Sequence, residues 1–266
     1  MTSPGAAPVA AVDDAELHRR QDVSQRAFHR AVAETSPGGM VVRDGGGLQV
    51  TIVPAAARLA LFNCVFYHDR AALLDALAAI RDEYRRAGVP SWIVWVPPWD
   101  REGARLLRDA GLSRGGALMV TAAVLAQLHL EPEEELELEP DPTVEMVAAC
   151  NDHAHRLGSD QSMAGAFAGL GSTDMRVYAA RHQGEVACAG LVRYDGDHCY
   201  PWGLAAAPAA RGSLVAIELM RLILRDAIAA GCTTGSGEVT RAGETIGAYL
   251  GKRPIGRYDL WVGRSS

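Results

Sequence analysis

The sequence lacks the features that mark several large classes of protein. Its formal net charge is -6 at pH 7, so it has no basic excess of the kind that duplex nucleic acid binding usually requires. No apolar run reaches the length of a membrane span, and the N-terminal segment shows no basic stretch followed by an apolar one. We therefore expect no nucleic-acid partner, no membrane partner and a cytoplasmic location.

Cysteine pairs are also missing. The five cysteines are odd in number, widely spaced and never arranged as CxxC, which argues against a disulfide framework and against a zinc site. Cys188 and Cys199 lie in apolar segments without a recognisable His or Asp partner, so packing explains them better than nucleophilic chemistry. We expect no bound metal.

Acidic residues are concentrated in one segment. Residues 129–142 carry seven of them together with three prolines, so the rest of the chain sums to -6 + 7 = +1. Like charges and prolines favour a solvated connector or an edge strand over a packed helix. The sequence therefore predicts a tail at 1–11, a first lobe at 12–128, a linker at 129–142 and a second lobe at 143–266.

Hydrophobic periodicity predicts an α/β (α+β) fold in which each lobe has a mixed, mostly antiparallel sheet flanked by helices. In the first lobe, helices are expected at 13–33, from Asp69 to Gly88 and at 100–110, and strands at 47–53, 60–67, 91–96 and 118–124. In the second lobe, helices are expected at 143–157 and 213–230, and strands at 175–181, 186–194, 198–206 and 233–240. The first lobe has no glycine-rich loop that would cradle a phosphate.

A strand, a small-residue turn and a long helix follow one another between His198 and Ala230. Backbone amides at the start of a helix have no intrahelical partner and attract anions, so this turn suits a pyrophosphate. Its segment LAAAPAARGSLVA resembles the acyl-CoA loop of the GNAT (general control N-acetyltransferase-related) superfamily, RxxGxG/A. Arg211 and Ala216 match the ends of that motif, and Leu214 replaces its central glycine.

The C-terminal segment 231–263 resembles the end of the same family, a strand, a short helix and a final strand. In this alignment Gly247 stands where the family usually has the tyrosine that protonates the departing thiolate, and Lys252 stands where phenylalanine is usual. Tyr249 comes two positions later, a rotation of about 200° along a helix, so it takes that role only if the helix is reset. Residues 87–112 resemble a degenerate GNAT half, which implies a tandem, two-lobed member.

This resemblance implies an N-acyltransferase that uses acetyl-CoA, or another acyl-CoA, as co-substrate. The acceptor, a small amine, would attack the thioester carbonyl directly, with backbone amides of 198–206 polarising that carbonyl. The residues that the resemblance assigns to the donor are Leu204, Ala205, Ala206, Arg211, Gly212, Ser213, Leu214, Val215, Ala216 and Thr240. Arg211 has the alternative of a surface ion pair.

Candidate catalytic residues are Glu238 as the general base and Tyr249 as the hydroxyl donor. Glu238 lies in a strand, where glutamate often only faces solvent. His198, Tyr200 and Trp202 alternate along one strand and therefore share one face, where they either wall the acceptor site or pack in the sheet core.

Other interpretations stay open. Asp152, His153 and His155 contain an HxH pattern, but residues two apart on a helix diverge, which favours surface polarity over a metal site. Besides acyl transfer, the fold would also suit a changed reaction or donor, or a non-catalytic ligand-binding module. A homodimer is a further possibility.

Overall fold

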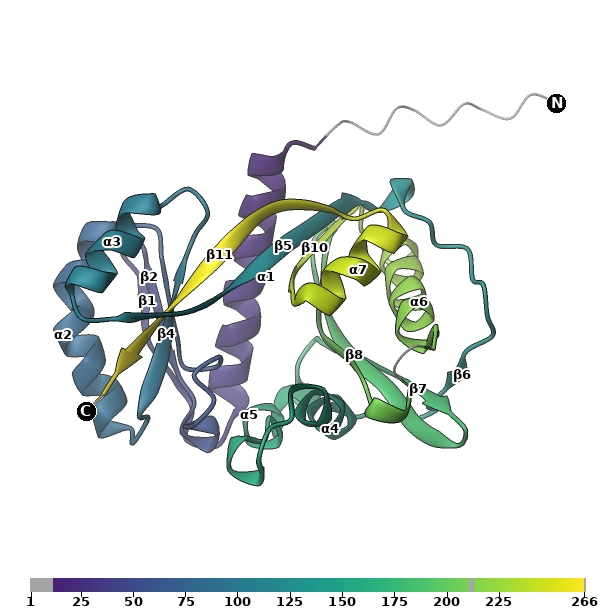
Figure 1. The fold of residues 1–266 in the computed structure, drawn as a ribbon, viewed down its shortest axis with the longest axis horizontal. Helices are drawn as coiled ribbons and strands as arrows, with labels where there is room; N and C mark the ends of the chain where they lie inside the picture. The colour runs from purple at the N-terminus through teal and green to yellow at the C-terminus, as the bar shows by residue number, and fades with distance from the viewer. Residues whose placement is uncertain (1–11, 211–212, 266) are drawn as a thin grey trace.

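The computed structural model describes residues 12–210 and 213–265, so the predicted tail at 1–11 lies outside the described residues (Figure 1). Two lobes lie side by side, and the long helix α1 (Asp14–Thr35) stands between them. Asp13 caps α1 by accepting a hydrogen bond from the amide of Glu16. No helix of the described part of the chain is long and apolar enough to cross a membrane.

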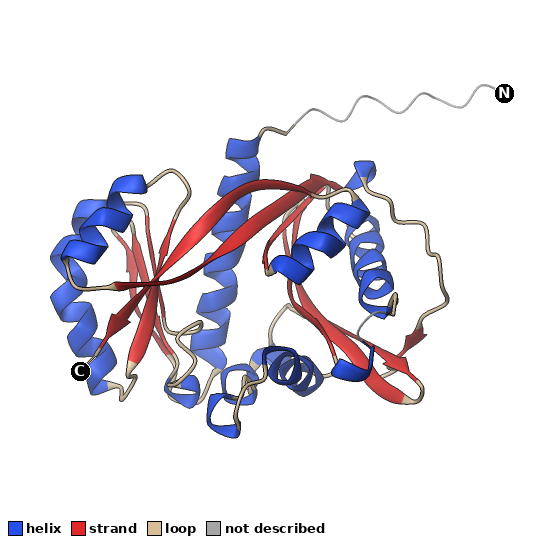
Figure 2. Ribbon diagram, in the orientation of Figure 1, coloured by secondary structure: helices blue, strands red, loops and turns tan. Residues whose placement is uncertain are grey.

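One sheet runs through both lobes (Figure 2). Its strand order is β1-β2-β3-β4-β11-β5-β10-β9-β8-β7-β6, and only the β3–β4 and β9–β10 pairs are parallel. The strands are β1 (Met40–Gly45), β2 (Leu48–Ile52), β3 (Cys64–Tyr67), β4 (Ser91–Val96), β5 (Ser113–Val124), β6 (Glu137–Leu138), β7 (Arg176–His182), β8 (Glu185–Asp195), β9 (His198–Ala206), β10 (Thr234–Val239) and β11 (Arg253–Arg264).

The lobes exchange strands at the centre of this sheet. β11, the last strand of the chain, pairs with β4 of the first lobe on one edge and with β5 on the other. β5, in turn, pairs over Met119–Val124 with β10 of the second lobe. The division at 129–142 stays a prediction for the chain, while the hydrogen-bonded sheet is continuous across it.

Helices cover both faces of the sheet. The other helices are α2 (Arg70–Arg86), α3 (Arg101–Asp109), α4 (Val144–His155), α5 (Ala164–Phe167), α6 (Val215–Ala229) and α7 (Arg241–Leu250). α2 and α3 bury their apolar faces on β2, β4 and β11, and α6 packs on the strands of the second lobe. α1, α4 and α5 share a different core.

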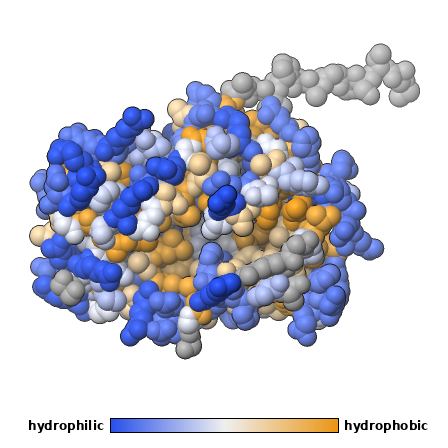
Figure 3. Space-filling model, in the orientation of Figure 1, coloured by the Kyte–Doolittle hydropathy of each residue, from blue (hydrophilic) through white to orange (hydrophobic). Residues whose placement is uncertain are grey.

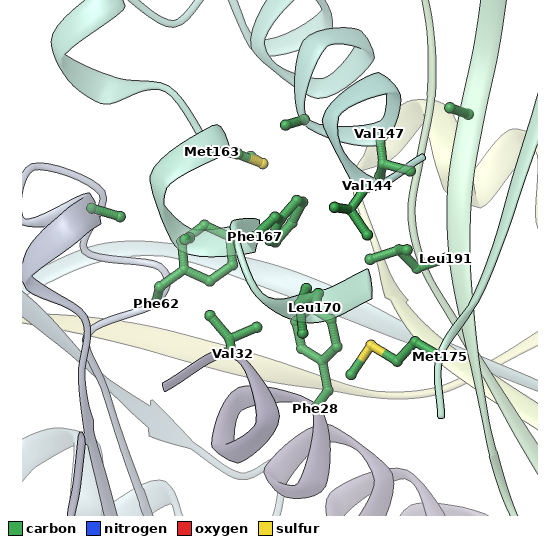
Figure 4. Packing of buried hydrophobic residues seen from close by; sticks show 14 of the residues in the cluster. Phe28, Val32, Phe62, Val144, Val147, Met163, Phe167, Leu170, Met175 and Leu191 are labelled. Carbon is green, nitrogen blue, oxygen red and sulfur yellow. The ribbon is translucent and has the colours of Figure 1, made fainter. Parts of the chain in front are cut away.

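That shared core joins the two lobes (Figure 4). Phe28 and Val32 of α1 meet Phe62 of the first lobe and Phe167 and Leu191 of the second, all nearly fully buried. Because one apolar cluster takes side chains from both lobes, the lobes are expected to unfold together.

Most of the predicted elements are confirmed. The exceptions lie at the edge of the sheet and near its centre, where β5 and β11 join the two lobes. β1 was not predicted: it carries Arg43 and Asp44 and is largely exposed, so it lacks an apolar pattern. β3 is shorter than predicted because residues 60–63 form turns. β5 begins at Ser113, where small and polar residues become a strand because β11 pairs beside them.

The acidic connector is held at two points. Its short strand β6 pairs with β7 at the edge of the sheet, in agreement with the expected edge strand. Glu139 is buried and accepts a hydrogen bond from Arg181 at 2.8 Å. Glu133 pairs with Arg221 of α6.

Candidate active site

The parallel strands β9 and β10 separate soon after they meet. They pair at only two positions, Thr234 with His198 and Gly235 with Cys199. β10 stays paired with β5 as far as Val239, while β9 stays paired with β8 as far as Ala206, so each strand is held by its other neighbour. An opening therefore forms between β9 and β10, and the surface is hollowed between the two lobes beside α7 (Figure 3).

A β-bulge shapes β9 beside this opening. Gly203 and Leu204 together lie opposite Gly190 of β8, where the register shifts. Gly203 has φ +63°, a conformation that favours glycine, and Asn151 of α4 donates a hydrogen bond to its carbonyl at 2.6 Å. The bulge turns the backbone of β9 where its free edge faces the opening. Ala205 and Ala206 then return to regular pairing with β8.

The start of α6 lies just beyond β9. Leu214 occupies the N-cap position, and no side chain of the described residues caps this helix. The amides of Val215 and Ala216, in the first turn, therefore remain available to an anion. Ser213 donates its hydroxyl to the carbonyl of Ala210 at 2.6 Å, which closes the turn. The predicted donor residues Arg211 and Gly212 lie outside the described residues.

Glu238 lies on β10 at the opposite side of the opening, facing α1. Gln21 of α1 donates a hydrogen bond to one carboxylate oxygen at 2.5 Å, and Tyr200 donates its hydroxyl to the other at 2.6 Å. Burial is the largest influence and raises the pKa of Glu238 to about 7, although both hydrogen bonds act to lower it. Glu238 keeps a partly exposed surface. A carboxylate with this pKa is suited to accept a proton near neutral pH.

The three alternating residues of β9 do share one face, the face toward α1. Both ring nitrogens of His198 lie 2.8 Å from hydroxyls of Thr234 and Ser236, and burial lowers its pKa to about 4. Tyr200 is fully buried. Trp202 is partly buried and stacks on Phe28 of α1, with ring centroids 4.6 Å apart. Of these three, only Trp202 keeps surface for an acceptor.

Two further predicted site residues lie on α7. Thr240 is its N-cap, and its hydroxyl accepts a hydrogen bond from the amide of Gly243 at 3.5 Å. Tyr249 is exposed, and its hydroxyl lies 2.8 Å from a carboxylate oxygen of Glu133. α7 is regular from Arg241 to Leu250, so the structure does not bring Tyr249 together with Glu238.

Sequence reasoning missed the partners that come from other elements. Gln21 lies 217 positions from Glu238 in the chain, and Asn151 lies 52 positions from Gly203. Neither belongs to a motif, so no local signal marks them. No group of three or more potential metal ligands occurs within residues 12–210 and 213–265, the HxH segment included. Asp152 instead accepts hydrogen bonds from Ser162 and the amide of Met163.

A second hollow, of about 590 Å³, lies between α1, β1 and β2. Its arginines already have acidic partners: Arg26 pairs with Asp22 and Arg30 with Asp44.

Comparisons with known proteins identify similar domains and similar folds. Residues 151–235 match the model of the acetyltransferase (GNAT) domain family. A tandem GNAT protein from the clavulanic acid biosynthesis pathway superposes with a TM-score of 0.58 at 16% identity, covering 97% of this chain and 98% of that one. This chain has the tandem GNAT fold. The expected fold class is thereby confirmed, and the expected GNAT resemblance is supported over residues 151–235.

Other solved structures with this GNAT architecture are similarly distant. A GCN5-related N-acetyltransferase from Kribbella flavida gives a TM-score of 0.64 at 14% identity, covering 91% of this chain and 94% of that one. A conserved protein of unknown function from Staphylococcus epidermidis gives 0.63 at 10% identity, covering 85% and 94%. No curated protein matches the sequence. At these identities the likeness establishes the GNAT fold, and the reaction has to be argued from the site.

Proposed function

We propose that the second lobe is an N-acyltransferase that moves an acyl group, acetyl in the simplest case, from acyl-CoA to a small amine. The observation that carries the proposal is the position of Glu238, a carboxylate with a pKa of about 7 at the opening between β9 and β10. On the other side of the same opening, no side chain of the described residues caps the start of α6. A base for the amine and an anion-binding helix start thus flank one gap.

The chain's own residues supply three parts of the reaction. The amides of Val215 and Ala216 hold the donor's pyrophosphate. Backbone amides on the free edge of β9, near the bulge at Gly203, stabilise negative charge on the thioester oxygen. Glu238 accepts the proton of the attacking amine. Gln21 and Tyr200 hold its carboxylate in place for that step.

Isothermal titration with acetyl-CoA and CoA tests the donor site first. We expect micromolar binding by the wild-type protein, followed by acetyl transfer when a panel of small amines, amino acids and aminated antibiotics is offered. Absence of binding would contradict the proposal. Binding of acetyl-CoA without transfer of the acetyl group to any acceptor would favour a different donor or reaction.

A further inference from the structure

Lys252 is the only lysine among the 26 Lys and Arg residues of the sequence, and it is buried. It follows Gly251, which ends α7 in a left-handed conformation with φ +93°. Arginine stays protonated in proteins, whereas a buried lysine can gain and lose its proton. The one side-chain amine of the sequence therefore has only 8% of its surface exposed.

The side chain of Lys252 lies over Gly247 of α7. A Cβ atom added to Gly247 would lie 3.5 Å from Cβ and 3.7 Å from Cδ of Lys252, and 3.7 Å from the hydroxyl oxygen of Thr121. A residue larger than alanine at 247 would compete with Lys252 for this space. Lys252 thus fills the place beside the position where the GNAT resemblance expects tyrosine.

Neither Lys252 nor Thr121 has a polar partner among the described residues. The buried hydroxyl of Thr121 accepts and donates no hydrogen bond there, and the Lys252 side chain, 8% exposed, forms no ion pair there. Burial lowers the pKa of Lys252, and the Cys199 thiol has the opposite, smaller effect. A buried hydroxyl without a partner beside an ammonium without an ion pair points to a ligand at this place.

These groups lie where the opening between β9 and β10 begins. Thr121 of β5 pairs with Gly237 of β10. Gly237 lies two residues beyond Gly235, the last position at which β10 pairs with β9. Cys199 is that last paired residue of β9, and it interacts electrostatically with Lys252. It alternates with His198 and Tyr200, so it faces away from α1. Lys252 therefore approaches the opening from the side of α6 and α7.

We propose that Lys252, with the Thr121 hydroxyl beside it, protonates the thiolate that departs in acyl transfer. This assignment rests on the proposed function. The amine nitrogen bonds to the carbonyl carbon, the carbon–sulfur bond breaks with its electron pair on sulfur, and sulfur takes a proton from Nζ. Glu238 accepts the proton of the amine. Lys252 then regains a proton from solvent and Glu238 releases one, so the products are an amide and CoA thiol.

The chemistry of an ammonium suits this role. Burial makes the Lys252 ammonium a stronger acid, which brings its pKa toward that of a thiol and favours proton transfer to the leaving group. The titratable groups coupled to Lys252 are His198 and Cys199 on β9. Burial raises the pKa of Cys199 to about 12 and lowers that of His198 to about 4, so both stay neutral near pH 7.

Lys252→Met tests the proposal because methionine keeps the length of the side chain without its charge. We expect kcat to fall about 100-fold, while the affinity for S-methyl-CoA changes by less than about twofold. A second readout is the pH profile of kcat. Wild type should lose activity at alkaline pH as Lys252 loses its proton, and Lys252→Met should lack this alkaline fall.

A paired exchange sharpens the test. Lys252→Phe should lose activity like Lys252→Met, and Gly247→Tyr combined with Lys252→Phe should regain about tenfold by placing a hydroxyl in the same space. Unchanged kcat and an unchanged alkaline fall in Lys252→Met would overturn the assignment while leaving acyl transfer intact. Failure of wild type to bind acetyl-CoA would overturn both.

Discussion

Each lobe contains a parallel strand pair joined by a helix, and the two units differ where chemistry would occur. In β3–α2–β4, three of the four residues of β3 pair with β4, so the strands stay closed. In β9–α6–β10, only two residues of each strand pair. Asp69 caps α2 by accepting hydrogen bonds from two first-turn amides, whereas no side chain of the described residues caps α6.

The side chains that face α1 differ in the same sense. In the first lobe, Phe66 and Trp95 stack with centroids 5.7 Å apart, and His29 of α1 packs against both. In the second lobe, Tyr200 and Glu238 form a hydrogen bond. The first lobe thus has an apolar, closed and capped version of the unit. In the second lobe, strand separation, a helix start that no described side chain caps and an ionisable group occur together.

Glu238→Gln should break this comparison most strongly. We expect kcat/KM to fall by about 10²–10⁴-fold, because glutamine cannot accept the amine proton. In wild type, kcat/KM should rise with pH through about 7 as Glu238 ionises. Steady-state rates across pH 5–9 check both points. A variant that keeps the wild-type rate and pH profile would exclude Glu238 as the base.

The same variant should alter stability in the opposite direction. Because the folded protein raises the pKa of Glu238 from 4.5 to about 7, ionisation of Glu238 costs stability as pH rises through that range. Glu238→Gln removes this cost, so its Tm should exceed that of wild type at pH 8, with the difference shrinking below about pH 4.5. Thermal melts at both pH values are the measurement.

Phe28→Ala tests whether the lobes, although different, unfold as one unit. Phe28 is 1% exposed and stacks on Trp202 of the other lobe, so its truncation should cost about 3–5 kcal/mol. Denaturant unfolding should still show a single transition. Val23→Ala on the same helix is the control, since Val23 is 49% exposed and should change stability by less than about 0.5 kcal/mol. Two separate transitions would show that the lobes are independent.

Leu214→Asp would make the start of α6 resemble that of α2. A carboxylate at this N-cap would bind the first-turn amides and repel a pyrophosphate, so the affinity for acetyl-CoA should fall about tenfold. Leu214→Asn caps the helix without charge and should have a smaller effect. Calorimetric titration of the three proteins gives the comparison, and equal affinities would place the donor elsewhere.

Asp69→Ala is the reciprocal change and should have the smallest effect. Loss of the cap should lower stability by about 1 kcal/mol, and acetyl-CoA should still bind with a stoichiometry of one. The closed β3–β4 pair leaves no room for a donor in the first lobe. A second binding event in the titration would show that the cap alone prevents acetyl-CoA from binding in the first lobe.

Much of the second lobe could be predicted from the sequence. The strand His198–Ala206, the turn and the long helix follow from apolar periodicity, small residues and the GNAT loop motif. The common face of His198, Tyr200 and Trp202 follows from strand alternation alone. Local patterns suffice for such features because they depend on neighbouring residues.

The environment of Glu238 could not be predicted in that way. Its partner Gln21 comes from the helix that begins the chain, and nothing in the segment around residue 238 shows that α1 covers this face. Likewise, the exchange of β11 between β4 and β5 depends on which strand edges are free once both lobes form. A sequence pattern indicates that a strand is present, but it does not determine which strands pair with it.

The sequence by itself therefore determined the α/β elements, the GNAT-like loop and the candidates Glu238 and Leu214. Only the tertiary structure decided that Glu238 is partly buried with a pKa of about 7, that Tyr249 contacts Glu133, and that Lys252 fills the space over Gly247. The physical reason is that burial and proximity set the protonation and orientation of a side chain. Both arise from segments that are far apart in the chain and meet only in the folded protein.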